Sequence, residues 1–189
     1  MEEKVFKETK AIKKGHFLLA SGLHSEFYFQ AQCLLQYPWY ASDAGKEISG
    51  LWKNSHIDVI VSLAIGGIVL GQEVARFLQV RHIFLERKNR NFSLESGFNL
   101  TKGENVLLVE DVITTGGSLK EVISKLKKYK IKIIGITSLV LRGKVKFSYP
   151  LKSLLNINWD KYSPDDCPLC KKEIPLQIPG TKQKQENTS

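Results

Sequence analysis

Residues 106–123 read VLLVEDVITTGGSLKEVI, and this stretch decides the fold of the chain. The apolar run at 106–109 predicts a buried strand, and Glu110 and Asp111 follow it directly. The small and hydroxylated residues at 114–118 predict a turn that opens into a helix. A strand that delivers two carboxylates into a glycine-rich turn indicates a ligand site rather than a plain connection.

Alternating strand and helix patterns continue outward from this unit. Strands are expected at residues 57–64, 81–85, 105–110 and 131–141, and helices at 2–14, 38–53, 68–78 and 118–129. The alternation predicts an α/β fold, with a mostly parallel central sheet flanked by helices on both faces. Such sheets bind ligands where their strands end. The expected site gathers residues 64–67, 86–88, 110–118 and Arg142.

Composition limits the classes of protein that the chain can represent. Its 189 residues are enough for one domain with a proper core. No apolar run reaches the roughly 18–20 residues that a membrane span needs, and the first residues do not resemble a signal peptide. The three cysteines do not make a disulfide framework. We therefore expect a cytoplasmic protein with no membrane span.

The net charge of +9 suits an anionic partner. The lysines are dispersed along the chain, however, and no arginine cluster alternates with aromatic residues, as a nucleic-acid surface would require. A phosphorylated small molecule is therefore the expected partner, and nucleic acid is not.

The turn at 114–118 has the composition of a phosphate cradle. Glycines let the backbone approach an anion, and the start of the following helix favours negative charge. No lysine follows the glycines, so this is not the GxxxxGK[ST] loop. The adjacent glycines do not have the spacing of GxGxxG either. Glu110 and Asp111 would repel a phosphate unless they bind hydroxyls of the same ligand, such as a ribose diol. The structural alternative is exposed acids before a helix that Ser118 caps, with Glu121 completing a capping box.

The stretch at 110–118 resembles the phosphoribosyl pyrophosphate (PRPP) signature of type I phosphoribosyltransferases. Three further stretches resemble orotate phosphoribosyltransferases: GHFLLASGLHS at 15–25, LQYP at 35–38 and CPLCKKEIP at 167–175. The resemblance implies the type I phosphoribosyltransferase fold, as a single domain at 1–179. Its core would lie at about 57–142 and a small amino-terminal and carboxyl-terminal hood at 15–36 and 143–179. The tail at 180–189 is expected to be disordered.

The resemblance also implies roles for individual residues. Glu110, Asp111 and Lys88 would be catalytic. PRPP would be bound by Arg87, Lys88, Glu110, Asp111, Val112, Ile113, Thr114, Thr115, Gly116, Gly117 and Ser118. Orotate would be bound by Thr114, Arg142, Tyr28 and Phe29. Residues 64–67 would form a second pyrophosphate-binding turn, and the loop at 87–103 would close over the site.

The implied enzyme transfers phosphoribosyl from PRPP to orotate. Mg²⁺ would be the cofactor, bridged through substrate oxygens with no metal ligand from the chain. A homodimer is implied as well. Two other functions stay open: a purine-type phosphoribosyltransferase, and a non-catalytic PRPP sensor that binds nucleic acid.

The chain departs from the family pattern at several positions. Ala20 stands where some members carry lysine, and Ile65 and Gly66 replace an aromatic–lysine pair. Residues 89–97 read NRNFSLESG, in which Arg90 is the only basic residue. These departures bear on how much the closing loop contributes to catalysis, and they leave the expected ribose and phosphate contacts intact.

Cys167 and Cys170 have the CxxC spacing of a metal site, but zinc needs four ligands. The remaining candidates are Cys33 and the histidines His16, His24, His56 and His82. A lone CxxC is a weak signal, so a tight turn packed on the domain is the favoured interpretation, and His24 is expected to pack or hydrogen-bond within its aromatic segment.

Overall fold

The computed structural model describes residues 1, 3–89 and 91–179. Arg90 and the tail at 180–189, for which disorder is expected, lie outside these residues. No helix in the described part of the chain is both long and apolar enough to cross a lipid bilayer.

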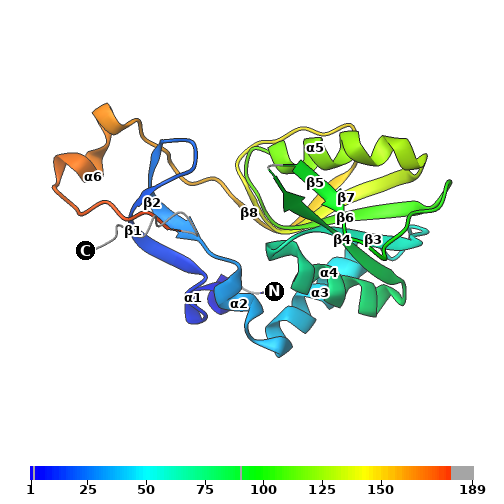
Figure 1. The fold of residues 1–189 in the computed structure, drawn as a ribbon. Coiled ribbons are helices and arrows are strands. Elements are labelled where there is room, and N and C mark those ends of the chain that lie inside the picture. The colour runs from blue at the N-terminus through cyan, green and yellow to red at the C-terminus, as the bar shows by residue number, and fades with distance from the viewer. Residues whose placement is uncertain (2, 90, 180–189) are drawn as a thin grey trace, which may run out of the picture.

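The central sheet contains six strands in the order β5-β4-β3-β6-β7-β8 (Figure 1). They span Val59–Leu63 (β3), Arg81–Lys88 (β4), Asn91–Leu94 (β5), Asn105–Ile113 (β6), Lys132–Arg142 (β7) and Leu151–Ile157 (β8). Every neighbouring pair is parallel except β4 with β5. The expected mostly parallel sheet is therefore confirmed. β5 and β8 were not expected, and β8 carries the sheet past the expected core boundary at residue 142.

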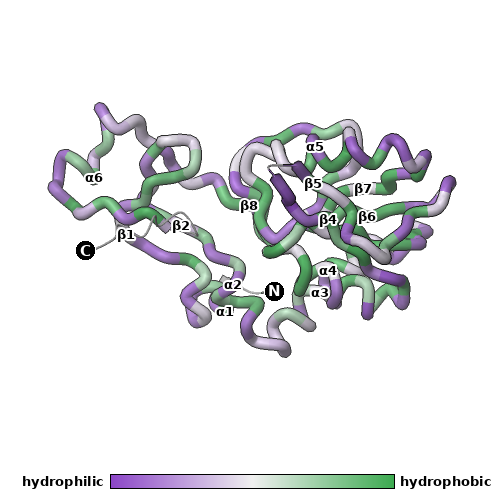
Figure 2. The backbone as a smooth tube through the Cα atoms, in the orientation of Figure 1, coloured by the Kyte–Doolittle hydropathy of each residue, from purple (hydrophilic) through white to green (hydrophobic). Residues whose placement is uncertain are grey.

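Helices cover both faces of this sheet (Figure 1). One face carries α3 (Pro38–Leu51) and α4 (Gly66–Leu78), and the other carries α5 (Gly117–Leu126), which continues into the 3₁₀ turn Lys127–Tyr129. Side chains alternate along β3: Ile60 packs with α3 and α4, whereas Val59 and Val61 pack with α5. Figure 2 shows hydrophobic residues concentrated along the strands between these helices.

A smaller unit, here called the hood, lies beside the sheet (Figure 1). It contains the antiparallel strands β1 (Ile12–Leu18) and β2 (His24–Phe29), the 3₁₀ turn Pro164–Asp166 and α6 (Pro168–Lys171). Isolated bridges join β1 to Gln177 and His24 to Tyr162. The hood therefore combines segments from both ends of the chain. The short helices α1 (Glu3–Glu8) and α2 (Gln32–Leu35) flank it.

The helix expected at residues 2–14 is too long. α1 ends at Glu8, and Lys10 has a positive φ of 56° that stops the helix. From Ile12 onward the chain pairs with β2, with Ile12 opposite Phe29. Gly15, which directly follows the expected helix, lies within β1. Tertiary pairing thus overrides an amphipathic pattern of modest length.

Candidate active site

The turn between β6 and α5 forms a small concavity at the carboxyl edge of the sheet. A cavity of about 60 Å³ is lined by Glu110, Val112, Ile113, Thr114, Thr115, Gly116, Gly117, Ser118 and Leu119. Gly116 has a φ of 73°, and a Cβ there would lie 2.6 Å from Cζ of Phe147. Both facts call for glycine. The sequence-predicted cradle is therefore a concave loop at the amino end of a ten-residue helix.

The alternative interpretation, in which Ser118 caps α5, is wrong. The helix begins at Gly117, its N-cap is Gly116, and no side chain makes a capping hydrogen bond. Glu121 does not complete a capping box either. Its carboxylate accepts hydrogen bonds from the Phe92 backbone N–H and from Nη2 of Arg87, both at 3.0 Å. Ser118 lines the small cavity instead.

Glu110 and Asp111 lie in β6 where it reaches this cavity. Burial raises the pKa of Glu110 well above its usual range, and the charge of Asp111 raises it further. Glu110 therefore keeps its proton to a higher pH than an ordinary glutamic acid. The higher pKa of Glu110 reduces the repulsion between the two adjacent acids and their repulsion of a nearby phosphate.

The turn at residues 64–67 approaches the same acids. α4 starts at Gly66, where the sequence pattern indicated residue 68, and the Ala64–Ile65 peptide bond is cis. A Cβ on Gly66 would collide with the carboxylate of Asp111. The amino end of α4 therefore lies against Asp111.

The family resemblance assigns Asp111 to PRPP binding. Replacing Gly66 with alanine is therefore expected to raise the KM for PRPP about tenfold, because the added methyl group would overlap the Asp111 carboxylate and push it out of position. Steady-state kinetics at saturating orotate measure this. Gly50→Ala is the matched control, since a Cβ there meets nothing within 4 Å. An unchanged KM in Gly66→Ala would show that the turn at 64–67 does not position Asp111.

A larger cavity of about 470 Å³ adjoins the cradle. Its lining consists of Leu18, Leu19, Ala20, Ser21, Tyr28, Phe29, Ala31, Gln32, Asp111, Val112, Thr114, Thr115, Arg142, Lys161 and Pro179. The four residues assigned to the base, Thr114, Arg142, Tyr28 and Phe29, thus line one cavity with Asp111. The hood supplies one wall of this cavity and the edge of the sheet supplies the other.

Arg142 is the only arginine among the described residues that line that cavity. It lies at the end of β7 and its side chain is buried, with 8% of the residue exposed. Its Nε is buried and has no hydrogen-bond partner among the described residues. Burial lowers the pKa of this guanidinium, and the proximity of Tyr28 acts in the opposite direction. A buried guanidinium with an unsatisfied donor is well suited to receive an anion in the cavity.

Lys161 is a residue of this site that sequence reasoning missed. It lines the larger cavity with Arg142, although it follows β8 in an irregular segment with no motif. Ala20, which stands where some family members carry lysine, lines the same cavity. Lys161 therefore supplies a cation to this cavity from a different part of the chain.

Neither Arg87 nor Lys88 is among the described residues that line these two cavities. Lys88 forms ion pairs with Glu95 at 2.8 Å and Glu86 at 3.8 Å, and Glu95 raises the pKa of Lys88. Arg87 pairs with Glu121 and stacks on the ring of Phe92, 4.1 Å from its centroid. Arg87 and Lys88 are consecutive residues of β4, and successive side chains of a strand point to opposite faces of the sheet. The two cations therefore cannot both point at one ligand from this strand.

Comparison with known proteins gives the class first. A family model described as "Phosphoribosyl transferase domain" matches residues 41–163, more than half of the chain. The adenine phosphoribosyltransferase from Rhodothermus marinus shares the fold, with a TM-score of 0.66 at 16% identity over 82% of this chain and 100% of that one.

The particular family follows from closer relatives. The orotate phosphoribosyltransferase of Caldicellulosiruptor saccharolyticus is 46% identical over 180 residues, covering 94% of each chain. The crystal structure of orotate phosphoribosyltransferase from Aeropyrum pernix superimposes with a TM-score of 0.71 at 25% identity, over 82% of this chain and 93% of that one. The chain belongs to the orotate phosphoribosyltransferase family and has the type I phosphoribosyltransferase fold.

Proposed function

We propose that this enzyme transfers the phosphoribosyl group of PRPP to orotate, giving orotidine 5′-monophosphate and pyrophosphate in pyrimidine biosynthesis. The position of Arg142 is the observation that favours orotate over other bases. A buried guanidinium lines the cavity next to the phosphate cradle, and a guanidinium pairs bidentately with a carboxylate. Orotate carries a carboxylate, whereas purine bases do not.

Each part of the site has a role in this proposal. The turn at 114–118 binds the 5′-phosphate through backbone N–H groups and hydroxyls. Glu110 and Asp111 bind the ribose hydroxyls, whose O–H groups can donate hydrogen bonds to carboxyl oxygens. The turn at 64–67 binds pyrophosphate. Arg142, Thr114 and the strand at Tyr28 and Phe29 hold orotate.

The reaction is a displacement at C1 of the ribose. A ring N–H nitrogen of orotate gives up its proton to water and forms the new bond to C1 as the bond to pyrophosphate breaks, and the bonding electrons leave with pyrophosphate. The chain's contribution is to hold the two substrates in line and to exclude water, because hydrolysis of PRPP is the competing reaction.

Magnesium is the proposed cofactor of this reaction. Mg²⁺ prefers oxygen ligands, but Glu110 and Asp111 are assigned to the ribose hydroxyls, and two adjacent acids are too few to enclose an ion. We propose that substrate oxygens and waters would hold the ion, with no metal ligand from the chain. When bound, the ion neutralises charge on the leaving pyrophosphate.

A PRPP-consumption assay with a panel of bases tests this function. Orotate, uracil, adenine and hypoxanthine are each offered with PRPP and Mg²⁺, with a chelator-treated sample as a control. Only orotate is expected to release pyrophosphate, and only with Mg²⁺. Turnover of a purine would support the purine-type alternative, and no turnover with any base at saturating substrate would contradict an enzymatic function.

We also propose a homodimer. Arg87 and Lys88 are not among the described residues that line the two cavities, as expected if the β4–β5 hairpin serves a neighbouring subunit's site. Sedimentation equilibrium gives the oligomeric state. Mixing Lys88→Ala with Asp111→Asn then tests the sharing of sites, because a mixed dimer would regain one intact site.

A further inference from the structure

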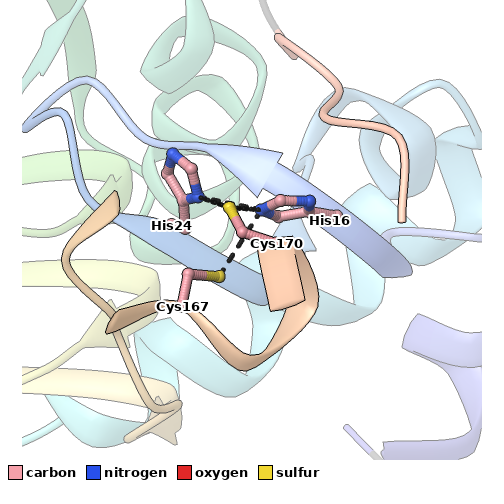
Figure 3. Close-up of side chains that lie close together, drawn as sticks. All are labelled: His16, His24, Cys167 and Cys170. Carbon is pink, nitrogen blue, oxygen red and sulfur yellow. Dashed lines mark hydrogen bonds between the residues drawn. The ribbon is translucent and has the colours of Figure 1, made fainter. Parts of the chain in front are cut away.

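Two histidines of the hood meet the two cysteines of the CxxC motif. His16 lies in β1 and His24 begins β2, whereas Cys167 precedes α6 and Cys170 lies within it. Figure 3 shows the four side chains converging on one point. One ligand atom from each residue can be chosen so that all four atoms lie within 4.8 Å of one another. His16, His24 and Cys167 are buried, and Cys170 is the most accessible of the four.

We propose that these four residues bind one zinc ion as a closed Cys₂His₂ structural site. Tetrahedral zinc, with bonds of about 2.3 Å to sulfur and 2.0–2.1 Å to nitrogen, places a sulfur and a nitrogen ligand about 3.6 Å apart. Nε2 of His16 lies 3.6 Å from Sγ of Cys167 and 3.7 Å from Sγ of Cys170. Nδ1 of His24 lies 3.3 Å from Sγ of Cys170. The two nitrogens, at 2.8 Å, need to separate only by about half an ångström.

The hydrogen-bond partner of His16 fixes the tautomer in which Nε2, the nitrogen that faces the cysteines, can bind a metal. Its Nδ1 lies 2.7 Å from the carbonyl oxygen of Ile174, which can only accept a hydrogen bond. Nδ1 therefore carries the proton, and the lone pair of Nε2 points at the cysteines. A backbone carbonyl that fixes the tautomer of a ligating histidine is a common feature of protein zinc sites.

The ligand set favours zinc over other occupants. Two thiolates and two imidazoles around one point suit Zn²⁺, because all four positions are filled and none is left open for catalysis. A two-iron cluster would need its cysteines and histidines on different iron atoms, farther apart than this group allows. Cys167 and Cys170 are free thiols in the structure.

The hood has few other means of holding its carboxyl-terminal segment. Residues 171–178 are all exposed, including Ile174, Leu176 and Ile178. In the described residues, the polar links between this segment and β1 are the backbone hydrogen bonds from the Leu18 N–H to Gln177 and from the Gln177 N–H to His16, and the contact of the His16 ring with the Ile174 carbonyl. A two-stranded sheet is at best marginally stable alone. A metal that joins α6 to both strands supplies stability that burial does not.

This site also bears on the substrate cavity. Leu18 and Tyr28 come from the strands that carry the two histidines, and Pro179 follows the segment that the cysteines hold. All three line the larger cavity, whereas the phosphate cradle belongs to β6 and α5. Loss of the metal is therefore expected to raise the KM for orotate more than the KM for PRPP.

Metal analysis of the full-length protein, made without a polyhistidine tag and under reducing conditions, tests the proposal without reference to catalysis. One zinc ion per chain is expected, and it should persist through dialysis against Mg²⁺ buffer. Replacement with Co²⁺ should give thiolate charge-transfer bands and the absorption of a tetrahedral site. A strong chelator should lower the unfolding temperature, and Zn²⁺ but not Mg²⁺ should restore it.

Variants identify the ligands. Cys167→Ser/Cys170→Ser is expected to lose the zinc, whereas Cys33→Ser and His56→Gln, which lie outside the cluster, should keep it. The wild-type measurements stand even if the double variant fails to fold. Four results would each overturn the proposal. They are the absence of zinc and of cobalt bands in reduced wild-type protein, loss of the zinc on dialysis, equal zinc in the double variant, and a Cys167–Cys170 disulfide in protein kept under reducing conditions.

Discussion

Asp111→Asn is expected to lower kcat/KM for PRPP by about 100-fold. The carboxylate of Asp111 can accept charge-assisted hydrogen bonds from ribose hydroxyls, and such a bond is worth roughly 1.5–3 kcal/mol, or about 10- to 150-fold. The amide keeps the size of the side chain, so Gly66 and the neighbouring turn stay in place. Steady-state kinetics with varied PRPP at saturating orotate measure the change.

Stability provides the control for this substitution. Asp111 raises the pKa of Glu110, so the folded state binds the Glu110 proton more tightly than the unfolded state does. A raised acid pKa contributes stability at low pH that is lost as pH rises through the folded pKa. Removing the Asp111 charge reduces that loss. The variant should therefore unfold at the same temperature as the wild type at neutral pH, or at a higher one. A lower unfolding temperature would indicate a structural role for Asp111.

Arg142→Ala is expected to reduce kcat/KM for orotate by about 100-fold while changing the KM for PRPP less than threefold. A bidentate, charge-assisted pair with a carboxylate is worth about 2–3 kcal/mol in a buried site. The proposed PRPP contacts come from β6, the β6–α5 turn and the start of α4, whose sequences the substitution leaves unchanged. Kinetics with each substrate varied in turn separate the two effects.

Arg142→Lys is the companion variant. It keeps the positive charge but loses the planar fork that matches a carboxylate. It should recover only part of the orotate affinity. Equal losses for orotate and PRPP in Arg142→Ala would show that the arginine supports the whole site rather than the base. Full recovery by lysine would show that charge alone is recognised.

The β6–α5 unit was predictable because its pattern is local. A run of four apolar residues, two acids and a glycine turn occupies residues 106–117, and each feature restricts the backbone within a few positions. The structure places the strand, the concave turn and the helix within a few residues of the prediction. The capping interpretation failed because Glu121 finds stronger partners in Arg87 and Phe92, which lie about thirty residues earlier.

The hood was less predictable because its contacts join the two ends of the chain. Cys167 meets His16 across 151 residues, so the CxxC motif showed only two of the four ligands. The other two histidines stood in a segment where packing was the favoured interpretation. Lys161 and β8 were missed for the same reason, because the residues around them contain no recognisable motif. Only the pairing of β8 with β7 brings this part of the chain to the edge of the sheet.

The order in which the hood is assembled has a consequence for biosynthesis. β1 and β2 are among the first segments to leave the ribosome, yet their partners, from Tyr162 to Gln177, are translated after the whole central sheet. The sheet can form while the hairpin waits, but the orotate cavity stays open on one side until Pro179 has emerged. A nascent chain can therefore form its phosphate cradle and place Arg142 before the wall of the larger cavity that contains Pro179 is complete.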